Sequence, residues 1–338
     1  MKRFECECGQ RVYFDNTMCL ACGQPLGFDP ERLEMLRLRP SGDNRFDTGL
    51  ASPSKRCRNA LDHGSCNWLL SADDPSEFCV ACRTTRTIPD LQRQDNFLLW
   101  VRMEQWKRRL LYTLLDLGLV SVSGGGGPWP SFRFLEDQRR NPNVTEMFVS
   151  TGHKDGVITI NLSEADDVSR QTQRQGLVER YRTVLGHLRH EAGHFFFPLL
   201  TREEDLLEAC RDLFGDEREP YDEALQRHYD NGPPSDWSAR YVSAYASMHP
   251  REDFAESFAH YLLIVDALET ASAEGLGSIG VGLPWVRRWI ELAIALNEIN
   301  RSLGSDDAYP FTLPTPVVEK LELVGRLVAR STGAPPPA

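Results

Sequence analysis

The sequence predicts an α+β protein in which two cysteine-bearing modules are followed by a mainly helical domain with a small β-sheet. Three observations support this prediction. Eight of the nine cysteines lie within residues 6–82. Residues 146–161 contain short β-rich runs around turn residues. From residue 167 to about residue 330, apolar residues recur at helical spacing between breaks at glycine and proline. The 338 residues suffice for about two domains.

The eight clustered cysteines divide into two groups of four. The first group is Cys6, Cys8, Cys19 and Cys22, and the second is Cys57, Cys66, Cys79 and Cys82. A zinc ribbon needs two short cysteine-bearing turns, whose four thiolates surround one tetrahedral ion. Gly9 and Gly23 each follow a cysteine, where such a turn needs a residue that tolerates positive φ. We therefore predict two structural zinc ions, one in a ribbon at residues 1–50 and one in a second module at residues 51–90.

The charge of the chain argues against two classes of partner. Lys and Arg number 38 against 49 Asp and Glu, a net charge of −11, and residues 1–90 are nearly neutral. A nucleic-acid-binding or anionic-membrane-binding protein needs a basic footprint. No run of 18 apolar residues is present, so no membrane-spanning helix is expected. Met1-Lys2-Arg3 leads into cysteine-rich sequence without an apolar segment, so we expect no secretory signal and a cytoplasmic location.

The region after the cysteines begins with a helix and a hairpin. Apolar residues at helical spacing from Leu91 to Leu117 predict a core helix. Two β-rich runs, Glu146–Ser150 and Val157–Asn161, flank the turn residues at 152–156 and predict a β-hairpin. We assign residues 91–332 to one domain. The proline-rich residues 333–338 are expected to be a disordered tail.

The sequence His190-Glu191-Ala192-Gly193-His194 carries the strongest chemical signal. It lies in a predicted helix from Gln175 to Phe197. Residues four apart share one face of a helix, so both imidazoles can bind one ion. Glu191 then lies beside them, where it can take a proton from metal-bound water. The longer metzincin motif is excluded, because it needs Gly and His where this chain has Phe197 and Leu200.

A catalytic zinc needs a third protein ligand and an open position. The best candidate segment is a second predicted helix that begins near Pro250. Glu252 and Glu256 lie one turn apart on it, so one carboxylate can bind zinc while the other accepts a hydrogen bond from the outer N–H of a ligand histidine. The residue types alone leave either glutamate as the ligand. His187 shares the face of His190 and His194, either as a partner of the site or as a core histidine.

These motifs resemble those of gluzincin metallopeptidases, in which His-Glu-x-x-His is followed on a later helix by Glu and a second acid. The pattern is most similar to the lethal-factor type, where a tyrosine stands seven residues before the ligand glutamate, as Tyr245 stands before Glu252. Residues 1–300 resemble a bacterial family of zinc-ribbon metallopeptidases. The motifs that carry this resemblance are the cysteines and residues 151–161, 181–187, 190–194 and 252–261. The resemblance implies one catalytic zinc on His190, His194 and Glu252, with Glu191 as general base. It also implies Tyr245 as oxyanion donor and Glu256 as a partner of a ligand.

The same resemblance implies a place for the substrate. Gluzincins keep an edge strand before the His-Glu-x-x-His helix, and unpaired strand amides bind an extended peptide through its main chain. The run here is Val157, Ile158, Thr159, Ile160 and Asn161. A plain hairpin without a binding role is the alternative.

The leading hypothesis is therefore a zinc metallopeptidase that acts on a peptide or protein, with ribbons that either recruit substrate or gate the cleft. The alternative is a nucleic-acid-associated zinc-ribbon protein whose protease-like domain is DNA-dependent or only structural. Zinc ribbons are common in nucleic-acid proteins, but an acidic chain is repelled by phosphates. An interaction scaffold with structural zinc sites alone is a third hypothesis, although the sequence offers no obvious fourth ligand to close the histidine site.

Overall fold

The computed structural model describes residues 1–124, 126–166 and 183–333. The chain forms two compact units, residues 1–170 and residues 171–338. Most of the predicted tail and residues 175–182 of the predicted helix lie outside the described residues. No helix in the described ranges is both long and apolar enough to cross a membrane.

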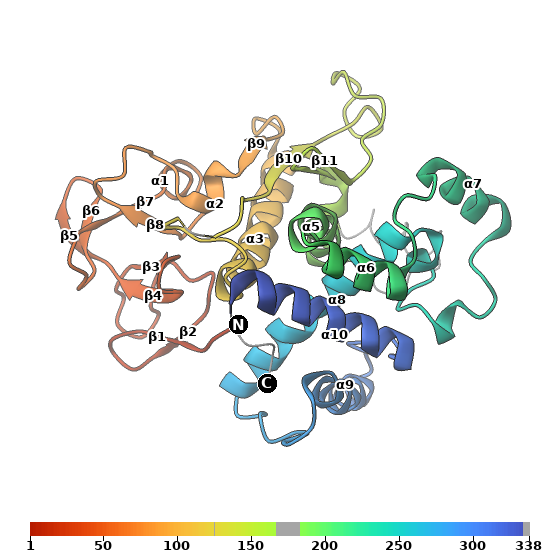
Figure 1. Ribbon diagram of the computed structural model, residues 1–338. Helices are drawn as coiled ribbons and strands as arrows, with labels where there is room; N and C mark the ends of the chain where they lie inside the picture. The colour runs from red at the N-terminus through yellow and green to blue at the C-terminus, as the bar shows by residue number, and fades with distance from the viewer. Residues whose placement is uncertain (125, 167–182, 334–338) are drawn as a thin grey trace. The chain divides into compact units, whose positions relative to one another are not determined.

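The cysteine-bearing region of the first unit consists of short antiparallel strands and two short helices (Figure 1). Its elements are β1 (Phe4–Glu5), β2 (Arg11–Val12), β3 (Leu26–Asp29), β4 (Glu34–Arg37), β5 (Arg39–Gly42), β6 (Arg45–Asp47), β7 (Ser54–Arg56), α1 (Arg58–Asp62), β8 (Leu69–Ser71) and α2 (Val80–Arg83). Gly9 and Gly23 have φ of 81° and 68°, as the ribbon turns require. Their amides donate to the carbonyls of Cys6 and Cys19, which closes both turns.

Helix α3 (Gln94–Asp116) shares a core with the cysteine-bearing region. The buried ring of Tyr112 packs against Phe14 and Phe28 at centroid distances of 5.6 and 6.1 Å. The fully buried Lys107 donates to the Ala81 carbonyl at 2.8 Å and pairs with Glu104 of its own helix at 2.7 Å. Residues 1–90 therefore complete the core around α3.

The last strands of the first unit form a four-stranded sheet. Its strands are β9 (Thr85–Thr87), β10 (Ser131–Leu135), β11 (Gly152–Lys154) and β12 (Val157–Asn161), followed by the 3-10 helix η1 (Leu162–Ala165). The predicted hairpin is present, but its first strand is β11 rather than residues 146–150. Asp155 and Gly156 both have positive φ, 49° and 77°, so the two-residue turn has the sign of a type I′ turn.

The order of this sheet is β11-β12-β10-β9. Strand β12 pairs antiparallel with β11 on one side and parallel with β10 on the other. The prediction that Val157–Asn161 is an edge strand for substrate is therefore wrong. The tight turn at residues 155–156 folds β12 back along β11. Strand β11 therefore pairs with the amides and carbonyls of β12 that a peptide would need.

The second unit is helical. Its elements are α5 (Val184–Leu200), α6 (Glu204–Phe214), α7 (Tyr221–Asn231), η2 (Trp237–Ala239), η3 (Tyr245–Met248), α8 (Pro250–Ala273), α9 (Trp285–Ser302) and α10 (Thr315–Thr332). Helices α5 and α8 pack closely because Gly193 has no side chain: a Cβ there would lie 2.7 Å from Cα of Ala255. Phe196 and Phe258 stack across the same interface, with centroids 5.7 Å apart. The buried Lys320 of α10 pairs with Asp253 of α8 at 2.5 Å.

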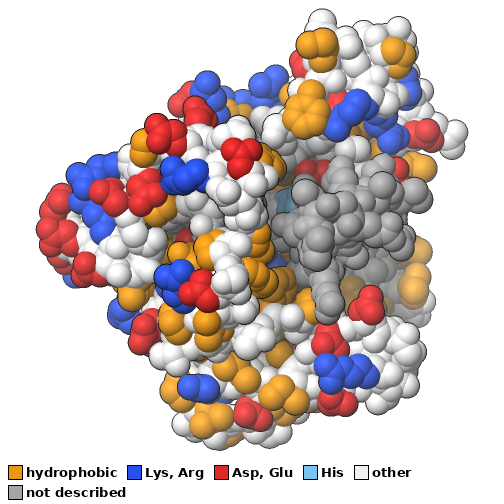
Figure 2. All heavy atoms as spheres, turned by 90° about the vertical axis from the view of Figure 1, so that its right-hand side faces the viewer, with side chains coloured by type: hydrophobic (Ala, Val, Ile, Leu, Met, Phe, Trp, Pro, Cys, Tyr) orange, Lys and Arg blue, Asp and Glu red, His pale blue; other side chains and the backbone are white. Residues whose placement is uncertain are grey.

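Charged side chains on the described surface are mixed in sign. Figure 2 shows Lys and Arg interspersed with Asp and Glu on the visible face. Many are paired, as Arg301 is with Asp307 and Arg218 with Asp216.

Candidate metal centre

Helix α5 carries the His-Glu-x-x-His residues. Thr183 caps its amino end, with its hydroxyl oxygen accepting from the Gly186 amide at 2.9 Å. His190 and His194 lie one turn apart, with ring centroids separated by 4.9 Å. Their Nε2 atoms are 3.1 Å apart, so the two imidazoles point at one place, as the sequence predicts.

Helix α8 begins at Pro250, also as predicted, and its capping residue is His249. Nδ1 of His249 accepts from the Arg251 amide at 3.0 Å, and Nε2 donates to the Glu219 carbonyl at 3.0 Å. One acceptor and one donor define a neutral imidazole. This cap fixes the first turn of α8, and with it the direction of the Glu252 side chain.

Glu252 joins the two histidines. Its Oε2 lies 3.0 Å from Nε2 of His190 and 3.3 Å from Nε2 of His194. Among the described residues, this buried oxygen has no hydrogen-bond partner of acceptable geometry. Three possible ligand atoms that all lie within 4.8 Å of one another fit a shared cation. Two imidazole nitrogens and one carboxylate oxygen are a donor set of catalytic zinc sites.

Glu256 lies on the other side of His190. Its Oε1 is 2.6 Å from Nδ1 of His190, and its Oε2 accepts from the Ser243 hydroxyl at 2.7 Å. An Nδ1–H that donates to Glu256 leaves the Nε2 lone pair free for a metal. The geometry thus separates the two glutamates: Glu252 shares the point of convergence, and Glu256 orients a ring.

The electrostatics of the centre favour positive charge. Burial opposes ionisation of Glu252, but contacts with His190 and His194 outweigh it and lower the pKa of this carboxyl well below its usual range. Burial also opposes protonation of His190, yet Glu252 and Glu256 raise the pKa of this imidazole well above 6.5. Carboxylates that stabilise the proton on His190 so strongly also stabilise a metal cation in place of that proton.

Glu191 lies beside the convergent atoms without joining them. Its side chain is buried, and within the described structure its Oε2 has no hydrogen-bond partner. Burial raises the pKa of Glu191, while the charges of His190 and His194 act in the opposite direction. A buried carboxylate with an unused oxygen next to the donor atoms can accept a proton there. His187 is half-buried and does not belong to the group of convergent atoms.

Tyr245 of η3 lies beside His190, with ring centroids 6.0 Å apart. Burial, and next the charge of Glu252, raise the pKa of this phenol well above its usual value, so it keeps its proton. Its protonated hydroxyl is hydrogen-bonded to the hydroxyl of Tyr221, the phenol that contacts Glu252.

The sequence analysis missed two residues that contact the glutamates. Ser243 donates to Glu256, and the Tyr221 hydroxyl donates to Oε1 of Glu252 at 3.0 Å. Neither belongs to a motif. Tyr221 precedes its partner by 31 residues, and only the fold brings them together.

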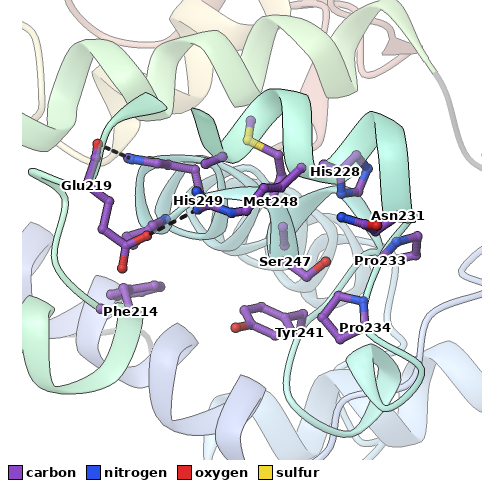
Figure 3. A pocket seen from close by; sticks show the side chains of 16 residues that line it. Phe214, Glu219, His228, Asn231, Pro233, Pro234, Tyr241, Ser247, Met248 and His249 are labelled. Carbon is purple, nitrogen blue, oxygen red and sulfur yellow. Dashed lines mark hydrogen bonds and ion pairs between the residues drawn. The ribbon is translucent and has the colours of Figure 1, made fainter. Parts of the chain in front are cut away.

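A cavity of about 520 Å³ lies within the second unit (Figure 3), and its lining includes neither the two histidines nor the glutamates of the centre. Its walls come from the end of α6, from α7, from η3 and from the start of α8. The labelled lining residues are Phe214, Glu219, His228, Asn231, Pro233, Pro234, Tyr241, Ser247, Met248 and His249. The His228 ring, which lines the cavity, lies 6.2 Å from the Tyr245 ring. The volume is in the range of small-molecule sites.

The two cysteine quartets form separate clusters in the first unit. In each, the four Sγ atoms lie within 4.8 Å of one another. The pairs Cys6–Cys22, Cys8–Cys19 and Cys66–Cys79 are 3.7 to 3.8 Å apart, too far for a disulfide and suited to ligands of one ion. In the second quartet all four cysteines are buried.

Comparison with known proteins agrees with both parts of this arrangement. Residues 96–327 match the family described as "Putative zinc-binding metallo-peptidase", and residues 3–93 match a zinc-ribbon domain. Uncharacterized proteins of Mycobacterium bovis and Mycobacterium tuberculosis are 39% identical over 343 residues, which cover 97% of this chain and 95% of each relative. No solved structure matches. The chain therefore belongs to this metallopeptidase family and carries the zinc-ribbon domain at residues 3–93.

Proposed function

We propose that the protein is a zinc-dependent peptidase in which His190, His194 and Glu252 hold one catalytic zinc ion. The observation that carries the proposal is the convergence of two Nε2 atoms and one carboxylate oxygen within 3.3 Å, with the buried Glu191 beside them. Three protein ligands leave a position open, as catalytic zinc sites do. The gluzincin resemblance of the sequence supports the same ligands.

The residues of the chain then divide the work of hydrolysis. When bound, zinc lowers the pKa of a coordinated water and polarises a carbonyl. Glu191 accepts the proton of the attacking water and returns it to the leaving amine. Tyr245 donates a hydrogen bond to the oxygen on which negative charge develops. Glu256 accepts from Nδ1 of His190 and so keeps the Nε2 lone pair directed at the ion.

We propose a peptide or protein as the substrate rather than a nucleic acid. The net charge of −11 and the mixed surface charges support this choice. A gel-shift experiment at low salt checks it, since phosphate binding is strongest there. We also propose one structural zinc ion in each cysteine quartet, which makes three zinc ions per chain.

Zinc stoichiometry and turnover together test the function. We expect three zinc ions in the wild type, two in the His190→Ala/His194→Ala double variant and three in Glu191→Gln. Glu191→Gln should lower kcat for a peptide substrate by roughly 10²- to 10⁴-fold, because it removes the proton acceptor and keeps the ligands. Two zinc ions in both the wild type and the double variant would show that His190 and His194 hold no zinc, and the proposed function would be wrong. Wild-type kcat in Glu191→Gln would remove the proposed role of Glu191.

A further inference from the structure

Three alternate residues of the segment that leads into α7, Glu217, Glu219 and Tyr221, contact the amino end of α8. The Glu217 carbonyl accepts from Nε of Arg251 at 3.1 Å, and the Glu219 carbonyl accepts from His249. Tyr221 follows as the first residue of α7, and its ring packs on His249 with centroids 5.2 Å apart. The backbone of this segment is thereby held at the helix end that carries Glu252.

The Tyr221 hydroxyl completes these contacts at the metal centre itself. It donates to Oε1 of Glu252, while Oε2 of the same carboxylate faces His190 and His194. One carboxylate oxygen is thus occupied by a neutral donor, and the other is left for a cation.

We propose that Tyr221 is a positioning residue of the metal centre, which holds the Glu252 carboxylate so that Oε2 alone faces the ion. This inference rests on the proposed function, because it assumes a zinc ion on His190, His194 and Glu252. A carboxylate without this hydrogen bond can rotate and present both oxygens, so part of its ordering has to occur when the metal binds. Partners of metal ligands commonly change metal affinity by about 10- to 100-fold.

The test is the zinc affinity of the full chain with Tyr221→Phe. This change removes one hydroxyl and keeps the ring on His249. Tyr229→Phe is the matched control, because Tyr229 lies on the same helix with 71% of its surface exposed. Zinc is titrated against a chelator, and the two ions retained by the His190→Ala/His194→Ala double variant are subtracted. We expect the affinity of the third ion to fall about 10- to 100-fold in Tyr221→Phe and to stay unchanged in Tyr229→Phe.

Tyr245→Phe separates a positioning role from a general effect of losing a phenol in this region. It should lower kcat, because Tyr245 is proposed to contact the reacting oxygen, and should change the zinc affinity less than Tyr221→Phe, because its hydroxyl is hydrogen-bonded to that of Tyr221. The melting temperature of each protein, with the third zinc ion removed and the two quartet ions retained, reports whether the fold is retained. Tyr221→Phe with wild-type affinity for the third zinc overturns the inference and leaves the proposed function standing. A wild type that binds no more zinc than the double variant overturns both.

Discussion

The cysteine quartets and the His190–His194–Glu252 centre are built differently. Each quartet takes its four possible ligands from within 26 residues of chain, whereas the histidine centre takes three from two helices, up to 62 residues apart. Four thiolates close a zinc site, and three donors leave it open. The difference teaches that a quartet can form a closed site from one short stretch of chain, whereas the open site needs two packed helices to bring its ligand atoms together.

The largest effect is expected when a cysteine quartet, the closed type of site, loses one ligand. Cys79→Ala removes a fully buried ligand, so the second quartet should lose its zinc. Structural zinc contributes roughly 10–16 kcal/mol in small zinc modules, more than such a module has from its core. We expect loss of one zinc ion and loss of hydrogen-exchange protection in residues 57–87.

Cys210→Ala is the control for this change, because Cys210 is equally buried but lies on α6, outside both quartets. It should retain all zinc. Protected amides at residues 57–87 in zinc-free Cys79→Ala would show that the region does not need its ion.

The next effect concerns the helical unit without zinc. Lys320→Met leaves Asp253 buried and unpaired, which should cost about 3–5 kcal/mol of unfolding free energy at pH 8. Burial raises the pKa of Asp253 to about 7, although Lys320 opposes the shift. A raised carboxyl pKa stabilises the fold in acid and loses that contribution as pH rises through the folded pKa. The deficit of Lys320→Met should therefore shrink from pH 8 toward pH 5.

Denaturant unfolding of the second unit, followed with zinc chelated, measures this deficit. Arg301→Met breaks an exposed pair instead and should cost at most about 1 kcal/mol at any pH. A deficit in Lys320→Met that grows in acid would contradict the assignment.

The smallest effect is expected when the packing of α5 on α8, which holds the open site together, is disturbed. Gly193→Ala places a Cβ 2.7 Å from Cα of Ala255, so α5 and α8 must move apart, at about 1–3 kcal/mol. Because the two helices hold different ligands, the affinity for the third zinc should also fall. Gly325→Ala is the control, since its nearest contacts are at an ordinary 3.5 Å. Equal zinc affinity in both variants would show that the centre tolerates helix movement.

Much of the site was predictable because its spacing is local. His190 and His194 share a helical face whatever surrounds the helix, and the cysteine turns carry glycines that the ribbon geometry needs. The capped start of α8 at Pro250 placed Glu252 and Glu256 one turn apart. Each of these predictions depends on neighbours within a few residues along the chain.

The errors and omissions concern contacts between distant residues. The strand at Val157–Asn161 was correctly located, but a hydrophobic run does not say which strands pair with it, and β10 and β11 take both of its sides. That side chains of α3 are buried against the ribbon region also depends on contacts between distant residues, which composition does not show.

The sequence by itself determined the two cysteine quartets, the paired histidines and the acid beside them, because helix and turn geometry relate residues at short separations. Only the tertiary structure decided that Glu252 faces both Nε2 atoms, that Glu256 lies against Nδ1 of His190, and that Tyr221 contacts the ligand carboxylate. The physical reason is that the packing of α5 on α8 and the bonding of residues 217–221 to the start of α8 set these directions, and neither has a local signature.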